Sequence, residues 1–275
     1  MITVWNRPGT RIESTAHRER RKVYVTVIDS FVNILMFHSI SDGRGPGCIP
    51  PAVFREQLCV LADRGFRGVS LGEYVAWRRG ELELDQPFAV LTFDDGYQDF
   101  ATAVFPELRA RGWNGTVFLP SSKVGQTSDW QGARQSVRLI EWQTIAELAK
   151  SGVEFGAHGM THVDLTRLPI DQADFEILNS KRTIEDHTAH RVVSFAPPYG
   201  RTNNRVRNQI GRHYLAAAGT TLGRATSQSD PFNLPRIEMW YFRDMKRWRY
   251  YVDRGSSGYY SLRRLMRLAR TVASR

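Results

Sequence analysis

The chain has 275 residues, of which 41% are hydrophobic and 24% are charged, which is ordinary for a globular protein with a sizeable core. Its two cysteines, Cys48 and Cys59, stand at a spacing that matches no common zinc or redox motif. The net charge of +10 belongs to the two ends: residues 1–22 hold six Lys or Arg and two Glu, and residues 241–275 hold ten Lys or Arg and two Asp. Because the body at 23–240 has no basic patch or recognition motif, no nucleic-acid partner is expected.

The polar segment 1–22 is expected to be a flexible basic arm. The first apolar stretch, at 23–36, is interrupted by Asp29 and Asn33, and no small-residue cleavage site follows it. No segment approaches the length of a membrane span. A cytoplasmic location is therefore expected.

From residue 33 onward, short apolar runs alternate with helical patterns, which indicates a parallel sheet with crossover helices. About seven strands, and no glycine-rich dinucleotide fingerprint after the first of them, favour a closed α/β barrel over an open nucleotide-binding sheet. We expect one barrel domain at 23–240 and a basic helical extension at 241–275. The patterns predict strands at 33–38, 88–93, 116–119, 153–157, 192–196, 215–220 and 234–239, and helices at 52–64, 101–111, 140–150, 171–186 and 202–213.

The strongest local signal is the pair Asp94 and Asp95, which directly follows the apolar run 88–93. The end of a barrel strand points into the mouth, where barrel active sites lie. Adjacent carboxylates repel each other unless a cation or a shared proton relieves them, so the pair suggests a metal or acid–base site. A simple turn is the alternative, because Asp-Asp-Gly is also good turn chemistry.

Two further segments follow strand ends in the same way. His158 and His162 are four residues apart, so a helical turn or a compact loop can direct both imidazoles at one metal, although two polar loop histidines are the alternative. Pro197 and Pro198 fix a rigid turn, and the backbone N–H of Tyr199 could be held toward a developing oxyanion. On its own, this third segment is also consistent with a turn that has only a structural role.

Together the three segments resemble the polysaccharide deacetylase family, also called the chitooligosaccharide deacetylase or NodB-homology family. Its motifs match Thr-Phe-Asp-Asp-Gly at 92–96, His-x-x-x-His at 158–162 and Pro-Pro-Tyr-Gly at 197–200. The segments 35–38 and 234–237 resemble the branch that acts on exopolysaccharides. The resemblance implies a distorted (β/α) barrel with one divalent metal, usually zinc, that removes N-acetyl groups from N-acetylhexosamine units of an oligosaccharide, polysaccharide or glycan precursor.

The resemblance also implies individual roles. Asp95, His158 and His162 would be the metal ligands, and Asp94 would be the general base that activates a water molecule. The backbone N–H of Tyr199 would stabilise the oxyanion. Pro198 and Tyr199 would line the substrate site, and His38, which ends the first predicted strand, is either a further site residue or a buried structural histidine.

The chain departs from the family pattern at two points. Ala196 stands where the family often has an arginine, and the late Leu-x-His motif that often supplies a general acid is absent. His213, the last histidine, ends a predicted helix and is not expected to be that acid. Arg236, inside the last predicted strand, is expected to supply the missing positive charge near Asp94, with a salt bridge at the barrel rim as the alternative. Without a general acid, turnover is expected to be slow.

Other residues leave alternatives open. Trp130 and Trp142 either stack on sugar rings or pack in loops and core. His187 and His190 precede a predicted strand, which puts them on the opposite face of the barrel. Two other functions also remain open: deformylation or deacetylation of a lipid-linked amino sugar, and glycan binding by a pseudoenzyme that retains its metal.

The segment 261–273 has helical spacing of apolar residues, including Leu262 and Leu265, with arginines such as Arg263 and Arg267 on the opposite face. Such a basic amphipathic helix can lie on an anionic membrane surface, which would make the protein a peripheral one at the inner face of the membrane. The alternative is a helix that packs on the barrel and leaves its arginines in solvent.

Overall fold

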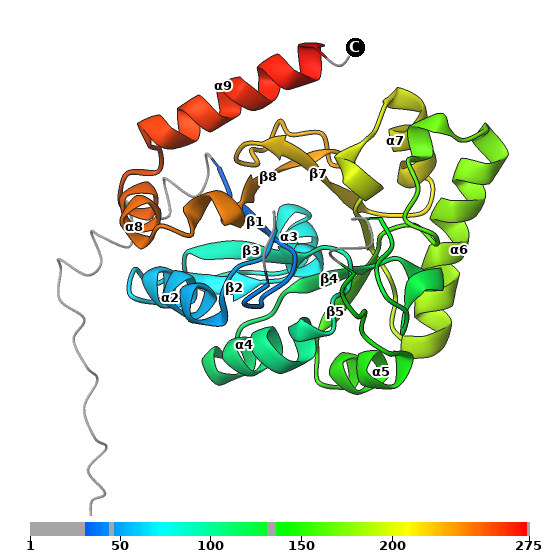
Figure 1. The fold of residues 1–275 in the computed structure, drawn as a ribbon, viewed down its shortest axis with the longest axis horizontal. Helices are drawn as coiled ribbons and strands as arrows, with labels where there is room; N and C mark the ends of the chain where they lie inside the picture. Colours follow the sequence, from blue (N-terminus) through cyan, green and yellow to red (C-terminus); the bar gives the residue numbers. More distant parts are fainter. Residues whose placement is uncertain (1–30, 44–46, 131–135, 274–275) are drawn as a thin grey trace, which may run out of the picture.

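Seven parallel strands form a closed ring in the computed structural model, which describes residues 31–43, 47–130 and 136–273 (Figure 1). The predicted arm at 1–22 lies outside the described residues. Strand β1 closes the ring because it pairs with β3 on one side and with β8 on the other. The ring consists of β1 (Ile34–Phe37), β3 (Phe88–Phe93), β4 (Thr116–Leu119), β5 (Glu154–Ala157), β6 (Ser194–Phe195), β7 (Ala216–Leu222) and β8 (Leu234–Glu238). The predicted α/β barrel is confirmed.

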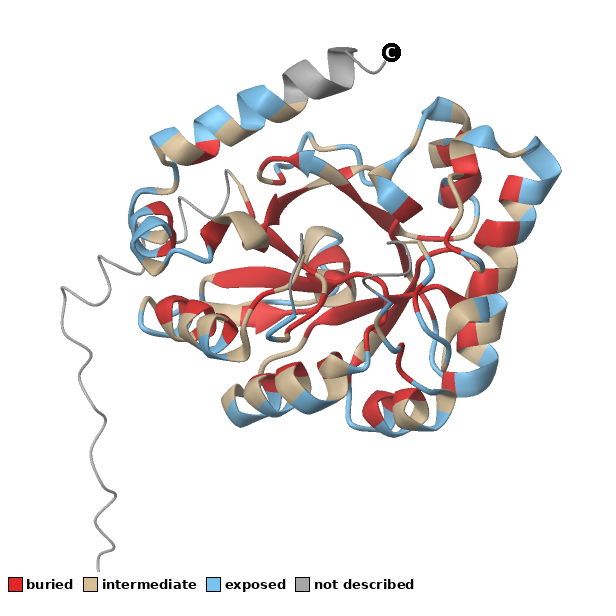
Figure 2. Cartoon of the chain, viewed as in Figure 1, coloured by how far each residue is buried: buried red, intermediate tan, exposed pale blue. Residues whose placement is uncertain are grey.

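The strands are buried on both faces, as expected for parallel strands covered by helices (Figure 2). Successive side chains alternate between the inside of the ring and the layer beneath the helices. Ile34, Val90 and Phe118 belong to the inner cluster, together with small alanines of β7. Their sequence neighbours Leu35 and Leu91 belong to the outer cluster, which packs against the helices.

Most of the helices surround the ring on its outside (Figure 1), whereas α3 packs its buried residues into the inner cluster. Each predicted helix is present within a few residues of its predicted bounds, and a short π-helical segment at Phe100–Val104 precedes α4. The helices are α2 (Pro51–Ala62), α3 (Leu71–Arg78), α4 (Phe105–Arg111), α5 (Trp142–Lys150), α6 (Ile170–Thr188), α7 (Asn204–Gly211), α8 (Met245–Arg254) and α9 (Gly258–Ala273).

One part of the barrel was not predicted: strand β2 (Arg67–Val69) and the helix α3 that follows it. Strand β2 pairs with the first half of β3 and does not belong to the ring. It has only three residues, too few for a visible alternation. Helix α3 did carry a signal, because Ser70 and Glu73 form a reciprocal capping box whose Ser-x-x-Glu pattern is readable in the sequence.

The C-terminal residues continue directly from the last barrel strand. Helix α8 packs against α2 through the fully buried Trp248, whose indole N–H donates to the carbonyl of Gln57 at 3.1 Å. Helix α9 then runs past the β7 and β8 side of the ring (Figure 1). Within the described ranges, no helix combines the length and the apolarity that crossing a bilayer requires.

Candidate active site

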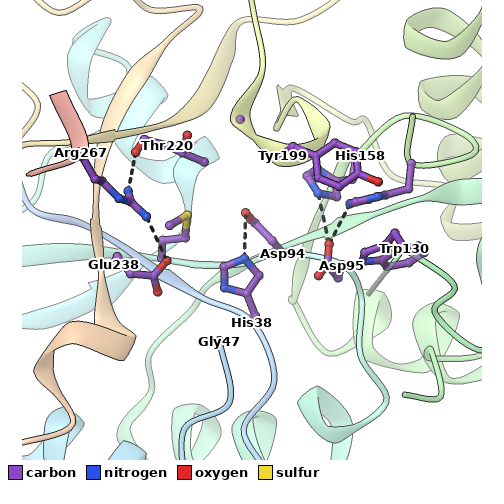
Figure 3. Close-up of a pocket in the computed structure, with 13 residues that line it drawn as sticks. His38, Gly47, Asp94, Asp95, Trp130, His158, Tyr199, Thr220, Glu238 and Arg267 are labelled. Carbon is purple, nitrogen blue, oxygen red and sulfur yellow. Dashed lines mark hydrogen bonds and ion pairs between the residues drawn. The ribbon is translucent and has the colours of Figure 1, made fainter. Parts of the chain in front are cut away.

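A cavity of about 420 Å³ lies at the carboxyl-terminal ends of the barrel strands (Figure 3). It collects most of the residues that the sequence singled out, from strand ends far apart in the chain. It is lined by Met36, His38, Gly47, Asp94, Asp95, Trp130, His158, His162, Tyr199, Gly200, Thr220, Glu238 and Arg267. Pro198, predicted to line the substrate site, is buried and is not among the lining residues.

Asp95, His158 and His162 form a compact buried group on one side of this cavity. One Asp95 carboxylate oxygen, Oδ1, lies 3.3 Å from Nε2 of His158 and 3.2 Å from Nε2 of His162. One candidate ligand atom from each residue can be chosen so that all three lie within 4.8 Å of one another. Two imidazole nitrogens and one carboxylate form a common catalytic set for a divalent metal.

The surroundings of this group fit a metal. His158 has Nδ1 at 2.6 Å from the carbonyl of Ala196; if Nδ1 carries the proton and donates it, Nε2 is left with a lone pair that faces Asp95. The hydroxyl of Tyr97 donates to the other Asp95 oxygen at 2.8 Å. Where the imidazoles instead carry a proton on Nε2, they donate it to Asp95; burial opposes ionisation of Asp95, but these hydrogen bonds outweigh it and hold the pKa of the carboxyl well below its usual range. The carboxylate is therefore ionised and oriented for a cation.

The backbone around the cavity is strained. Four non-glycine residues among the described ones have positive φ, and three of them line the cavity: Asp95 at 74°, His162 at 61° and Tyr199 at 60°. Each such conformation costs on the order of 1–3 kcal/mol, so it persists only where surrounding contacts enforce it. Here Glu176 of α6 does so for the histidine loop, because its carboxylate accepts hydrogen bonds from the backbone of Met160 and Thr161.

Asp94 is held by an arginine from the opposite part of the chain. Arg236 of β8 donates from Nη1 to Oδ1 and from Nη2 to Oδ2, both at 2.7 Å. The arginine side chain has no exposed surface, and it also donates to the carbonyl of Gly219 and the hydroxyl of Thr92. Burial opposes ionisation of Asp94, but the charge of Arg236 outweighs it and lowers the pKa of the carboxyl. The contact expected from the sequence is formed, inside the barrel and not at its rim.

His38 enters the cavity from the end of β1. Its Nε2 lies 4.0 Å from Oδ2 of Asp94, and its Nδ1 is buried with no hydrogen-bond partner among the described residues. The loop beyond β1 is fixed by Asp99, which accepts from the hydroxyl of Ser39 and the N–H of Ile40. Figure 3 shows His38 near Asp94, on the side of the cavity away from Trp130.

The two tryptophans lie in different places. Trp130 lines the cavity and stacks on His162 with ring centroids 4.1 Å apart. Trp142 lies on α5 and stacks on His187 of α6, away from the cavity lining. His213 lies beside Asp174 at 3.4 Å and also falls outside the lining residues.

Several residues of the cavity were not predicted. Glu238 ends β8, and its position at a strand end was a readable signal. Arg267 comes from α9: its Nη1 donates to the carbonyl of Thr220 at 2.7 Å, and its Nη2 lies 3.8 Å from Glu238 (Figure 3). The sequence could not indicate this, because it depends on how α9 packs on the barrel. Tyr97 and Glu176, which hold site residues in place, were missed for the same reason.

Comparison with known proteins agrees with this arrangement. The sequence profile of the family described as polysaccharide deacetylase matches residues 82–218. YxkH of Bacillus subtilis is 25% identical over 207 residues, which cover 75% of this chain and 70% of YxkH. The poly-β-1,6-N-acetyl-D-glucosamine N-deacetylase of Escherichia coli is 35% identical over 114 residues, 39% of this chain and only 17% of that protein.

Solved structures show the same fold. The deacetylase PplD of Streptococcus pyogenes aligns with a TM-score of 0.66 and 24% identity, over 76% of this chain and 92% of PplD. IcaB from Ammonifex degensii aligns with a TM-score of 0.67 and 19% identity, over 80% of this chain and 97% of IcaB. The sequence profile and the sequence relatives, with the three motifs gathered around one cavity, place the chain in the polysaccharide deacetylase family, and the solved structures share its fold.

Proposed function

We propose that the protein is a metal-dependent hydrolase that removes N-acetyl groups from N-acetylhexosamine units of an oligosaccharide, a polysaccharide or a glycan precursor. The observation that carries the proposal is the buried Asp95, His158 and His162 group beside an Asp94 carboxylate that Arg236 holds in the same cavity. The relative in Escherichia coli named as an N-deacetylase of an N-acetylglucosamine polymer supports the substrate class.

Asp95, His158 and His162 would hold the metal, with zinc as the proposed ion. A divalent metal bound there supplies a Lewis acid that polarises the amide carbonyl and lowers the pKa of water. The cation would also relieve the repulsion between the adjacent Asp94 and Asp95 carboxylates.

Asp94 acts as the general base. Arg236 occupies both of its oxygens from one side, yet Oδ2 still faces His38 and the cavity. The carboxylate takes a proton from the attacking water, and the water oxygen forms a bond to the acetyl carbon. The backbone N–H of Tyr199, at the cavity wall, would donate to the oxyanion that develops.

His38 is the proposed proton donor to the departing nitrogen. Of the histidines that line the described part of the cavity, the other two belong to the metal group. When the carbon–nitrogen bond breaks, His38 protonates the amine, and the products are acetate and a sugar with a free amino group. A positioned acid of this kind is worth roughly two to four powers of ten in rate.

The test is release of acetate from N-acetylated oligosaccharides, including β-1,6- and β-1,4-linked oligomers, by zinc-loaded wild type, chelated wild type and Asp94→Asn. We expect Asp94→Asn to retain bound metal and to lose activity by about two to four powers of ten. Asp186→Asn, an exposed carboxylate on α6, is the matched control and should keep wild-type activity.

The opposite result is informative as well. If wild type retains metal but releases no acetate from any of these substrates, or if Asp94→Asn is as active as wild type, the proposed hydrolysis is wrong. Glycan binding without turnover in that experiment would identify the pseudoenzyme described above.

A further inference from the structure

Helix α9 turns its apolar side chains outward. Leu262, Leu265 and Met266 have 55%, 65% and 41% of their surface exposed, although their spacing of three and four residues places them on one helix face. They are the exposed large apolar residues of the part of α9 whose side chains are described, where Gly258, Ser261 and Arg264 are also exposed, and the helix shows exposed residues along its length in Figure 2. An ordinary surface helix would bury this face and expose its charges.

The opposite face of α9 packs on the protein through arginines. The guanidinium of Arg263 lies 4.6 Å from the ring centroid of Tyr241, in the segment after β8, and 5.3 Å from that of Tyr259, one turn earlier on α9 itself. Arg267 lies 5.3 Å from the Tyr241 ring and donates to the Tyr241 hydroxyl at 3.1 Å. These contacts, with the buried Tyr260, fix which side of the helix meets the barrel. The outward direction of the leucines is therefore set by specific packing, and the alternative of a helix packed on the barrel with its arginines in solvent does not hold for Arg263 and Arg267.

The positive charge of the C-terminal segment indicates which kind of surface binds the apolar face of α9. Arg264 is exposed on the flank of α9, about 100° round the helix from Leu265, and residues 241–275 carry ten Lys or Arg against two Asp. A second copy of the chain docked face to face would bring like charges together, because such a contact pairs each patch with itself. An anionic lipid surface instead accepts the apolar side chains and attracts the cations around them.

We infer that the outer face of α9, defined by Leu262, Leu265 and Met266, docks the protein on an anionic membrane surface. The same helix reaches the active-site cavity through Arg267 on its inner side. Docking would therefore hold the mouth of the barrel beside the lipid surface, where a glycan attached to a lipid carrier is within reach. The docking itself does not depend on the proposed hydrolysis.

The test is co-sedimentation of the full chain with vesicles of mixed phosphatidylglycerol and phosphatidylcholine, compared with vesicles of phosphatidylcholine alone. We expect wild type to bind the anionic vesicles, with binding that weakens at high salt. The triple variant Leu262→Ser, Leu265→Ser, Met266→Ser should lower the partition coefficient by about tenfold or more. Serine side chains gain no favourable free energy when they move from water into the lipid, whereas the apolar side chains do. Arg264→Gln should lower it by about fivefold.

The matched control is Ile170→Ser with Phe175→Ser, which removes two apolar side chains of α6 that are 58% and 59% exposed. That variant should bind as wild type does. Equal binding by wild type and the α9 triple variant, or no binding by wild type, would overturn the inference. So would a wild-type dimer in analytical ultracentrifugation that the triple variant abolishes, since the occupant would then be a second copy.

Discussion

Each end of the barrel buries carboxylates, but the partners of these carboxylates differ in charge between the two ends and shift the pKa in opposite directions. At the bottom, Glu154 begins β5, and both of its oxygens are satisfied by neutral protein donors. The hydroxyls of Ser70, Thr116 and Ser194 donate to it at 2.7, 2.9 and 3.2 Å, and the N–H of Gly72 donates at 2.9 Å. A side chain at Gly72 would place its first carbon 2.2 Å from the carboxylate, so the group is closely packed.

At the mouth, Asp94 and Asp95 lie beside each other on the wall of an open cavity. Their partners are cationic or potentially cationic: Arg236 for Asp94, and two imidazoles for Asp95. Burial raises the pKa of Glu154 because its donors are neutral, whereas the partners at the mouth lower the pKa of both aspartates. Burial alone therefore does not distinguish a structural carboxylate from a reactive one. Two other properties distinguish them: the charge of the hydrogen-bonding partners, and whether the carboxylate borders an open cavity.

The largest effect on the mouth should come from Arg236→Lys. Lysine is a point charge and cannot hold both Asp94 oxygens, so the base loses its orientation. We expect kcat to fall by about a hundredfold with little change in KM, because the arginine positions the base and does not line the cavity. Acetate-release kinetics measure this split.

The matched control for that variant is Arg205→Lys on α7, where the arginine donates to backbone carbonyls of Leu165 and Leu168, outside the cavity. It should leave kcat unchanged. If Arg236→Lys raised KM and kept kcat, the arginine would bind substrate and its role in positioning Asp94 would be refuted.

At the bottom, the expected effect is on stability. Glu154→Ala should lower the free energy of unfolding by about 2–4 kcal/mol, because it leaves several buried donors without an acceptor and opens a void. Denaturant unfolding measures this change. Acetate release per folded molecule should match wild type, and a loss of kcat in the folded fraction would show that the two ends are coupled.

The smallest effect concerns pH. The pKa of Glu154 is raised above its ordinary value of 4.5 by burial, so the folded state holds the proton more tightly than the unfolded state does. The resulting stability is fully present below the ordinary pKa and is lost as pH rises through the folded pKa. Each pH unit in that window lowers the free energy of unfolding by at most about 1.4 kcal/mol.

Glu154→Gln should remove this slope, as measured by denaturant unfolding across a pH series. Glu147→Gln, an exposed glutamate on α5, should keep it. The assignment to Glu154 fails if wild type and Glu154→Gln have parallel stability profiles.

The sequence predicted the buried carboxylates and their partners far better at the mouth of the barrel than at its bottom. Asp94, Asp95 and His158 each directly follow an apolar strand, so strand ends alone predicted that they would meet. Arg236 was predictable because a charge inside an apolar strand needs a buried partner. Glu154 gave no such signal, since its partners are small neutral groups from two strands, β4 and β6, and from the start of α3. Arg267 reaches the cavity only through the packing of α9, which no local pattern encodes.

The closure of the ring by β1 has a consequence for how the protein matures. The first and last strands of the barrel meet at one seam, where Leu35 pairs with Ile237. His38 follows the first strand and Arg236 belongs to the last, so the two neighbours of Asp94 come from either side of that seam. During synthesis, the ribosome must release residues 234–238 before Asp94 can meet its arginine. Catalytic competence is thus acquired late, together with the pairing of the first and last strand edges of the ring.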